Sequence, residues 1–356
     1  MQIVFRTDAS LAIGNGHVMR CLSLAQRLHA QGATCSFVCA QEAGHLNALL
    51  KNHGFEVWPL ELQERDTRPH AETLLPHWQL DAQATQQAIG HHTVDWLVVD
   101  HYGLDQQWEA ILSPDVARLM VIDDLANRPH QCDLLLDANP GRQAAQYTSL
   151  TPANCTVLAG PRYALIRDEI RQARLTLPTD HGTRAALRIL VMMGGVDQDN
   201  ITGQVLSALD ALDSTVMLEI QVVMGPFAPW LNQVNEMSYQ MHWPTRVLQN
   251  PDNFVELMCT HDIAIGAAGT SALERCCLGL PSVNFVLAPN QRLSALALEA
   301  ADAAHLVELH ADWQATLHQY IRELQHHTSR QTMRQACMQI TDGSGTERVA
   351  QEMFHA

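Results

Sequence analysis

The chain has 356 residues and carries 22 Lys plus Arg against 38 Asp plus Glu, a formal net charge of -16 at pH 7. This acidic balance argues against a nucleic-acid partner, which needs a basic patch. The longest apolar runs have the length of a strand, and none approaches the roughly 18 residues that a membrane span requires. We expect no secretory signal and a cytoplasmic protein without a membrane partner, long enough for two domains.

Cysteine and acidic residues give no sign of a metal site. The nine cysteines contain no C-x-x-C spacing, and we expect them to be reduced and mostly buried. Asp123 and Asp124 follow a strand-like segment, where they can cap the turn or pair with Arg128. Asp197 and Asp199 match no metal-binding loop either. We therefore predict that the protein uses no metal and no cofactor.

Strand and helix patterns alternate along the chain in two series, which is typical of parallel sheets covered by helices. In the first series the predicted strands are residues 2–6, 34–40, 56–59, 96–100, 119–123, 134–137 and 155–158. Its predicted helices are residues 17–31, 45–52, 80–89 and 106–112. In the second series the predicted strands are residues 189–193, 218–224, 245–248, 263–266, 282–285 and 305–307. Its predicted helices are residues 200–210, 253–260, 271–278, 292–302 and 313–327.

The two series predict an α/β protein of two doubly wound, Rossmann-like domains that face each other across a cleft. We place the N-terminal domain at residues 1–170, a polar linker at 171–187 and the second domain at 188–340. Residues 341–356 form a C-terminal segment that we expect to pack back on the first domain. Residues 61–79 are polar and predict an irregular insertion.

The most informative loop follows the first strand. Gly14 and Gly16 punctuate it, and His17 stands at the first turn of the predicted helix. Dinucleotide-binding loops of the G-x-G-x-x-G type place small residues there, so an imidazole at this position indicates a catalytic group. Arg6 and Asp8 precede it in one polar cluster, and we expect them to bind substrate. A tight turn followed by a capping or core histidine is the structural alternative.

Two further loops follow strands at positions where such folds keep their chemistry. Asp100, His101 and Tyr102 follow the fourth strand, where they can orient a substrate or a catalytic water, or cap the next helix. Gly194 and Gly195 close the first strand of the second domain, and paired glycines allow the backbone to approach a phosphate. A plain strand-to-helix turn is the alternative there.

A fourth loop, residues 266–274, runs from a strand into a helix. Thr270 and Ser271 supply two hydroxyls beside the positive end of the helix dipole, which suits a phosphate. Glu274 falls one turn into the helix, where its carboxylate can accept hydrogen bonds from both hydroxyls of a ribose. An acidic residue in a first turn also favours the helix by itself.

Together these segments resemble the UDP-2,4-diacetamido-2,4,6-trideoxy-β-L-altropyranose hydrolases of pseudaminic acid biosynthesis, the PseG family. The resemblance is carried by residues 5–8, 13–20, 100–103, 123–124, 163–169, 193–197 and 266–274. It extends over residues 1–290, and the wider relatives are the GT-B glycosyltransferases, MurG among them.

The resemblance implies a GT-B fold and a hydrolase that removes UDP from a UDP-sugar substrate without a metal. It implies that His17 is the general base and that Tyr102 faces the substrate. It also implies that Glu274 holds the ribose and that the region of Thr270 and Ser271 holds the diphosphate. The matching segment 163–169 adds Arg167 as a residue that we expect to bind substrate.

This interpretation predicts that water attacks the anomeric carbon from the face opposite UDP, with inversion, and that His17 takes the proton. Either Asp8 or Asp100 can orient the imidazole. The main alternative is a GT-B glycosyltransferase that uses the same UDP-sugar site with another acceptor. A UDP-sugar epimerase and a non-catalytic nucleotide-sugar sensor are further alternatives, and the sequence leaves the oligomeric state open.

Overall fold

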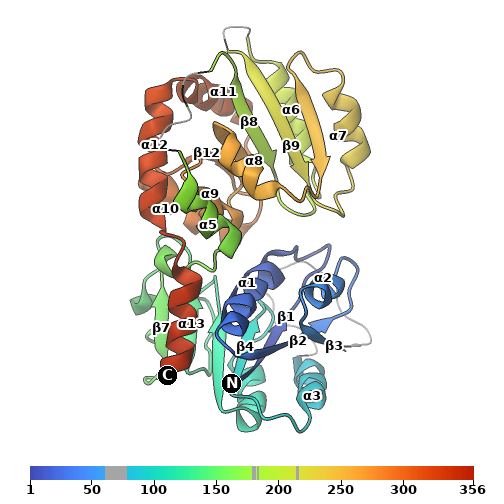
Figure 1. Cartoon of the computed structure of the whole chain (residues 1–356), viewed down its shortest axis with the longest axis vertical. Coiled ribbons are helices and arrows are strands. Elements are labelled where there is room, and N and C mark those ends of the chain that lie inside the picture. The colour runs from blue at the N-terminus through green and yellow to red at the C-terminus, as the bar shows by residue number, and fades with distance from the viewer. Residues whose placement is uncertain (61–77, 179–181, 183, 214–215) are drawn as a thin grey trace. The chain divides into compact units, whose positions relative to one another are not determined.

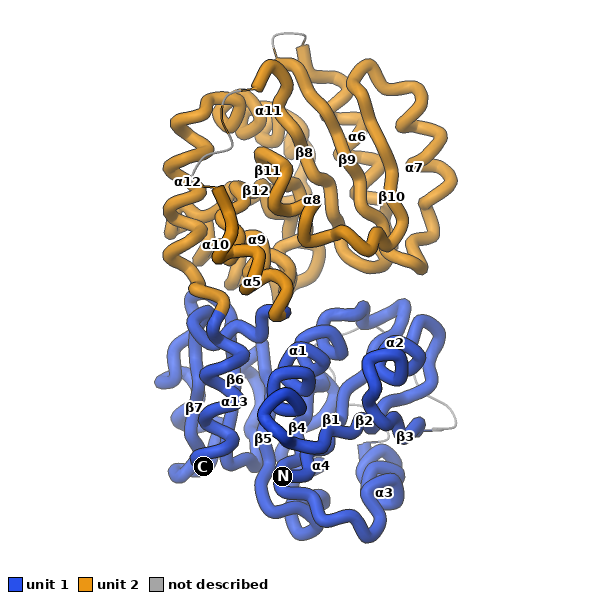
Figure 2. Tube along the Cα trace, in the orientation of Figure 1, with its two compact units in different colours: residues 1–167, 344–356 blue, residues 168–343 orange. Residues whose placement is uncertain are grey.

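The computed structural model describes residues 1–60, 78–178, 182, 184–213 and 216–356. These residues divide into two compact units (Figure 2): unit 1 comprises Met1–Arg167 and Ser344–Ala356, and unit 2 comprises Asp168–Gly343.

The boundary between the units differs from the predicted linker. Residues 171–176 belong to α5 (Asp168–Thr176), which unit 2 includes. Arg174 explains this assignment, because its guanidinium donates to the backbone carbonyls of Cys277, Met338 and Thr341 in the same unit. The predicted insertion at 61–79 lies outside the described residues, except for its last two residues, which begin α3.

Unit 1 is built on a sheet of parallel strands in the order β3-β2-β1-β4-β5-β6-β7 (Figure 1). Its described strands are β1 (Gln2–Thr7), β2 (Thr34–Ala40), β3 (Glu56–Leu60), β4 (Trp96–Asp100), β5 (Arg118–Ile122), β6 (Leu134–Asp137) and β7 (Thr156–Ala159). Its described α-helices are α1 (Gly16–Ala30), α2 (Asn47–Asn52), α3 (Trp78–Ile89), α4 (Gln106–Leu112) and α13 (Gly345–His355).

The alternation of side chains along β1 explains how helices cover both faces of this sheet. Ile3 and Phe5 enter one apolar core, which also holds residues of α1 and α13. Val4 points the other way, into a core with residues of α3 and α4. Because both faces are buried, the strands consist of nearly continuous apolar residues.

Unit 2 repeats the plan with parallel strands in the order β10-β9-β8-β11-β12-β13. Its described strands are β8 (Leu187–Met192), β9 (Leu218–Met224), β10 (Thr245–Gln249), β11 (Ile263–Ala267), β12 (Ser282–Phe285) and β13 (His305–Val307). Besides α5, its described α-helices are α6 (Ile201–Asp210), α7 (Leu231–Ser238), α8 (Phe254–Thr260), α9 (Ser271–Cys277), α10 (Arg292–Ala300), α11 (Trp313–Leu324) and α12 (His327–Ile340).

The prediction of two doubly wound α/β folds is confirmed. Each predicted strand is present, with ends within two residues of those expected. Helices α5, α7 and α12 were not predicted; α7 is short and fully buries only Val234 and Ser238. The nine cysteines, all described, are unpaired, and seven of them are buried, as predicted.

The last helix, α13, groups with unit 1 although 176 residues of unit 2 precede it. Val349, Ala350 and Met353 are buried in the same core as β1 and α1. The indole nitrogen of Trp96, on β4, donates to the carbonyl of Met353 at 3.0 Å. The C-terminal helix is thus part of the core of unit 1.

Replacing Val349 by Asp should destabilise unit 1, because the change puts an unpaired carboxylate into an apolar core. We expect Val349→Asp to lower the free energy of unfolding by about 3–5 kcal/mol. Phe354→Asp is the matched control, since Phe354 lies on the same helix and is 39% exposed. Denaturant titration followed by circular dichroism tests this, and equal stabilities of the two variants would contradict it.

Candidate active site

Two adjacent parallel strands with divergent connections define the switch point of each sheet, where doubly wound folds bind ligands at the carboxyl ends of the strands. In unit 1 these are β1 and β4, and Thr7 is in register with Asp100 at their ends. In unit 2 they are β8 and β11, with Met192 in register with Gly266. The four loops singled out in the sequence all follow these four strands.

His17 is the second residue of α1 and is 6% exposed. Its Nδ1 lies 2.6 Å from Oδ1 of Asp100. Nη2 of Arg20 is also near Nδ1, at 3.3 Å, but the shorter contact with a carboxylate assigns a proton to Nδ1. No hydrogen-bond partner for Nε2 occurs among the described residues. In the neutral ring, Nε2 therefore carries the lone pair that can accept a proton.

Asp100 is fully buried and paired on both oxygens. Arg20 donates from Nε to Oδ2 at 2.6 Å and from Nη2 to Oδ1 at 2.7 Å. Burial alone would raise the pKa of Asp100, but the charges and hydrogen bonds of Arg20 and His17 hold it well below its usual range. Asp100 is thus a fixed negative charge, and it holds the imidazole of His17 in one orientation.

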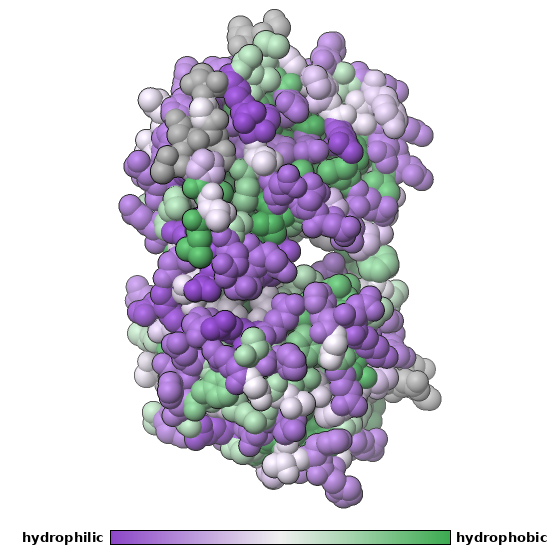
Figure 3. Space-filling view, viewed as in Figure 1, coloured by the Kyte–Doolittle hydropathy of each residue, from purple (hydrophilic) through white to green (hydrophobic). Residues whose placement is uncertain are grey.

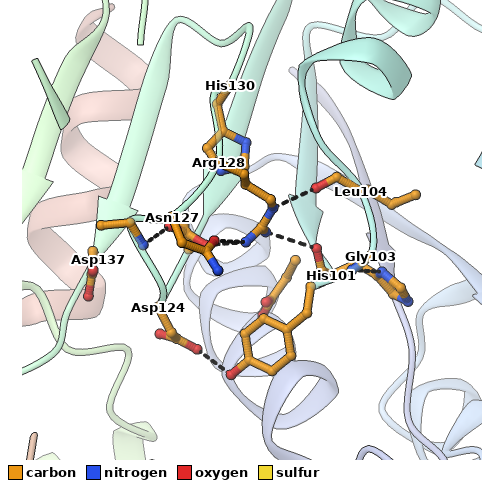
Figure 4. Close-up of polar contacts among 12 residues, drawn as sticks. His101, Gly103, Leu104, Asp124, Asn127, Arg128, His130 and Asp137 are labelled. Carbon is orange, nitrogen blue, oxygen red and sulfur yellow. Dashed lines mark hydrogen bonds and ion pairs between the residues drawn. The ribbon is translucent and has the colours of Figure 1, made fainter. Parts of the chain in front are cut away.

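Tyr102 completes this arrangement. Its ring meets that of His17 edge to face, with centroids 4.4 Å apart. Its hydroxyl donates to Asp124 at 2.8 Å, the contact drawn as a dashed line at Asp124 in Figure 4. Asp124 also accepts from Arg20 at 2.9 Å. Burial and the charge of Asp124 raise the pKa of Tyr102 well above its usual range, so the phenol stays protonated and remains a donor.

Arg128 fixes the loop that carries Tyr102. Its guanidinium donates to the carbonyls of His101 and Leu104 (Figure 4) and pairs with Asp123 at 3.0 Å. Asp123 also accepts from the amide of Ala126. The expectation that Asp123 caps a turn and pairs with Arg128 is confirmed.

Sequence reasoning missed two members of this group, Arg20 and Asp124. Arg20 follows His17 by three positions, a spacing that puts two side chains on the same face of a helix. This spacing is the feature of the sequence that indicates Arg20 as a neighbour of His17. The sequence indicates Asp124 as a cap or as a partner of Arg128, and its link to Tyr102 depends on two strands that are neighbours only in the folded sheet.

Arg6 and Asp8 do not form the expected substrate-binding pair. Arg6 is 0% exposed, and its guanidinium contacts both oxygens of Asp8 and both oxygens of Asp81. Asp8 also accepts from the amide of Ala40 at 2.7 Å. Because the donors of Arg6 are turned to buried carboxylates, we assign both residues a structural role. Of the two carboxylates proposed to orient His17, the structure selects Asp100.

The glycine loop of unit 1 shapes the approach to His17. Gly14 has a φ of +77°, a conformation that favours glycine, and its amide donates to the carbonyl of Ser10 at 2.9 Å. Gly16 is the first residue of α1. Arg167, also expected to bind substrate, is partly exposed and ends the first segment of unit 1.

The first loop of unit 2 differs in part from expectation. The carboxylate of Asp197 accepts from the amides of Ile201 and Thr202, so the start of α6 is already capped by the chain itself. Gly194, with a φ of +95°, and Gly195 remain as backbone that can meet a ligand. A Cβ on Gly225 would lie 1.9 Å from the carbonyl oxygen of Gly195, so this close approach requires glycine.

The second loop of unit 2 presents Thr270, Ser271 and Glu274 at the start of α9. Thr270 is exposed, while Ser271 and Glu274 are partly exposed. The Ser271 hydroxyl accepts from Arg275 at 3.2 Å. Three polar side chains therefore lie at the carboxyl end of β11, where the switch point of this sheet predicts a ligand.

Solved structures show which class of protein this fold defines. MurG of Acinetobacter baumannii aligns with a TM-score of 0.69 over 100% of this chain and 99% of its own, at 16% identity. A putative UDP-N-acetylglucosamine 2-epimerase of Listeria monocytogenes aligns with a TM-score of 0.62 over 98% and 94%, at 12% identity. The chain has the GT-B fold, as predicted.

Sequence comparison identifies particular relatives. Residues 188–352 match the glycosyltransferase family 28 C-terminal domain. The chain is 26% identical to the UDP-2,4-diacetamido-2,4,6-trideoxy-beta-L-altropyranose hydrolase of Campylobacter jejuni, over 72% of this chain and 81% of that protein. It is 27% identical to the spore coat polysaccharide biosynthesis protein SpsG of Bacillus subtilis, over 55% and 57%. The resemblance noted from the motifs is confirmed.

Among the described residues there is neither a candidate membrane-spanning helix nor a group of side chains suited to a metal ion. No described helix has the length and hydropathy to cross a membrane, and no three His, Cys, Asp or Glu residues of the described chain form a group that could hold a metal. On the face shown in Figure 3, hydrophilic side chains predominate and the apolar areas are separate from one another.

Asp100→Asn should change stability in a pH-dependent way. Because the folded pKa of Asp100 lies below its unfolded value of about 3.9, its contribution is complete above that value and is lost as the pH falls towards the folded pKa. At pH 7 we expect the variant to lose about 3 kcal/mol of unfolding free energy, since Arg20 loses a buried partner. The loss should be smaller at pH 3. Denaturant titrations at both pH values test this, and equal losses would contradict it.

Proposed function

We propose that this protein hydrolyses UDP-2,4-diacetamido-2,4,6-trideoxy-β-L-altropyranose, releasing UDP and the free sugar for pseudaminic acid synthesis. The observation that carries the proposal is the pair of His17 and Asp100, 2.6 Å apart, with Nε2 of His17 unengaged among the described residues. The similarity to the Campylobacter hydrolase and the match to a glycosyltransferase domain support a UDP-sugar as substrate.

In the proposed reaction His17 is the general base. Its Nε2 takes a proton from water as the water oxygen bonds to the anomeric carbon, and the bond from that carbon to the β-phosphate oxygen breaks. UDP leaves with the bonding electrons, and attack from the opposite face inverts the configuration. Asp100 stabilises the imidazolium that forms, and its orientation of the ring keeps Nε2 available.

Tyr102 and the glycines of the first loop have supporting roles in this proposal. Tyr102 is held against His17 by its bond to Asp124, so its ring can limit how the sugar lies beside the base. Gly14 and Gly16 allow the substrate to approach the backbone ahead of α1. Arg167 supplies a positive charge for the substrate.

Residues of unit 2 hold UDP in this proposal. Glu274 accepts hydrogen bonds from the ribose hydroxyls, and Gly194 and Gly195 offer backbone to the diphosphate. Thr270 and Ser271 donate hydroxyl hydrogen bonds to the phosphates. These donors stabilise the charge that gathers on the leaving β-phosphate, so the reaction proceeds without a metal.

Proton NMR of the purified protein with this UDP-sugar in EDTA tests the function directly. We expect UDP and free sugar to appear, with the first sugar signal in the opposite anomeric configuration. Retention of configuration would contradict direct attack by water, and arrest by EDTA would contradict metal independence. Binding without turnover would favour the alternative, a GT-B glycosyltransferase that awaits an acceptor.

His17→Asn should abolish most of the activity while leaving substrate binding nearly intact. We expect kcat to fall by about 10²–10⁴-fold with little change in KM, because the base acts mainly in the transition state. Release of UDP in a coupled assay measures both constants. Near-normal turnover in the variant would refute the assignment of His17 as the base.

Asp100→Asn should also lower kcat, by about 10²–10⁴-fold, since an amide can neither fix the required tautomer nor stabilise the imidazolium. Asp105→Asn is the matched control: Asp105 follows the same strand, but it caps α4 through the amide of Gln107, a role that Asn also fills. We expect the control to stay within about twofold of the unaltered rate. Equal rates for the two variants would argue against Asp100 as the orienting group.

A further inference from the structure

A buried arginine without a carboxylate partner lies beneath the second loop of unit 2. Arg275, on α9, is 0% exposed. Its guanidinium donates to the carbonyl of Ala267 at 2.9 Å and to Oδ1 of Asn284 at 2.6 Å. It also donates to the hydroxyls of Ser271 and Ser282. All four acceptors are neutral, so the hydrogen bonds are satisfied without a direct ion pair among the described residues, and the more distant charge of Glu274 stabilises the guanidinium.

The contrast with Arg6 shows how unusual this environment is. Both arginines are 0% exposed, but Arg6 contacts the carboxylates of Asp8 and Asp81. Burial lowers the pKa of Arg275 to about 10, whereas the pKa of Arg6 is raised. A buried charge is costly unless an opposite charge compensates it. The guanidinium of Arg275 therefore favours an anion from outside the chain.

Ser271 connects this charge to the surface. Its hydroxyl oxygen accepts from Nη1 of Arg275 at 3.2 Å. A hydroxyl that accepts from a cation has its own hydrogen left to donate, and no acceptor for this hydrogen occurs among the described residues. Because Ser271 is partly exposed, an incoming anion is a suitable acceptor. The hydrogen bond from Arg275 therefore leaves the Ser271 hydroxyl available to donate its own hydrogen to an anion.

The backbone beneath the loop is shaped to admit the guanidinium. A Cβ on Gly266 would lie 2.9 Å from Nη1 of Arg275 and 2.7 Å from the carbonyl oxygen of Met192. Any side chain at Gly266 would therefore displace either Arg275 or the neighbouring strand β8. Gly266, near the end of β11, and Arg275, on the helix that follows it, are therefore packed directly against each other.

We propose that Arg275 is a positioning residue for a diphosphate-binding site, acting through the Ser271 hydroxyl and through a buried positive charge that no carboxylate contacts among the described residues. This inference rests on the proposed UDP site of unit 2 and adds a residue that touches no ligand itself. It accounts for how a chain with a net charge of -16 holds an anion at this loop. The ligand class is a nucleoside diphosphate.

Calorimetric titration of the full-length protein with UDP and with uridine separates this role from a general structural one. We expect Arg275→Met to weaken UDP binding by about tenfold to a hundredfold, because a buried charge near a phosphate acts through a low dielectric. Uridine, which lacks phosphate, should bind within about twofold of the unaltered affinity. Arg275→Lys keeps the charge and should recover part of the loss.

Two further variants complete the test. Ser271→Ala should weaken UDP binding, and adding it to Arg275→Met should cost less than the sum of the separate losses, since the two act through one contact. Arg174→Met is the control, because Arg174 also donates to backbone carbonyls in unit 2 but lies on α5. It should bind UDP normally. If Arg275→Met does not fold, Arg275→Lys and Ser271→Ala still report the phosphate-specific loss.

Three results would overturn the inference. Equal weakening of UDP and uridine by the Arg275 variants would make the residue structural only. Unchanged UDP affinity in both Arg275→Lys and Ser271→Ala would remove the link to the diphosphate. Failure of the unaltered protein to bind UDP would overturn the proposed function as well, and that result is distinguishable because it needs no variant.

Discussion

The buried negative charge of Asp100 is the constraint on which the candidate active site depends. A carboxylate at the end of a central strand must be compensated, and α1 supplies both Arg20 and His17 for this purpose. The two side chains lie on one face of the helix, three residues apart. The ion pair therefore joins sheet to helix and at the same time fixes the direction of the imidazole. The same contact thus contributes to stability and orients the imidazole of His17.

The two units treat buried positive charge in different ways. In unit 1 the guanidinium of Arg6 is neutralised within the chain by Asp8 and Asp81, and it supports the loops without facing a ligand. In unit 2 Arg275 has only neutral acceptors. This difference accords with the proposed roles, in which unit 1 supplies the general base and unit 2 binds the anionic part of the substrate.

Much of the fold could be predicted because buried parallel strands are short apolar runs, which the sequence displays directly. The switch-point loops follow from the same runs, so the sequence alone indicates His17 and Asp100 as candidates. The sequence does not show which neighbouring group each side chain faces in the folded protein. Asp8 and Asp100 are equally plausible partners for His17 until the fold turns Asp8 towards Arg6. Helix α12 was missed because polar residues dominate it, and Asp197 was missed as a cap because capping depends on local backbone geometry.

The fold by itself assigns no reaction, since a glycosyltransferase and an epimerase share it. If His17 is the general base, as proposed, the reaction depends on which nucleophile its Nε2 deprotonates. In the proposal, the imidazole is held by Asp100 and flanked by the ring of Tyr102, and it activates a small nucleophile, water. A transferase must also hold and orient an acceptor sugar or lipid, which demands further contacts around the same nitrogen. In the proposed hydrolysis, Tyr102 lies beside the imidazole that activates water, with its ring centroid 4.4 Å from that of His17.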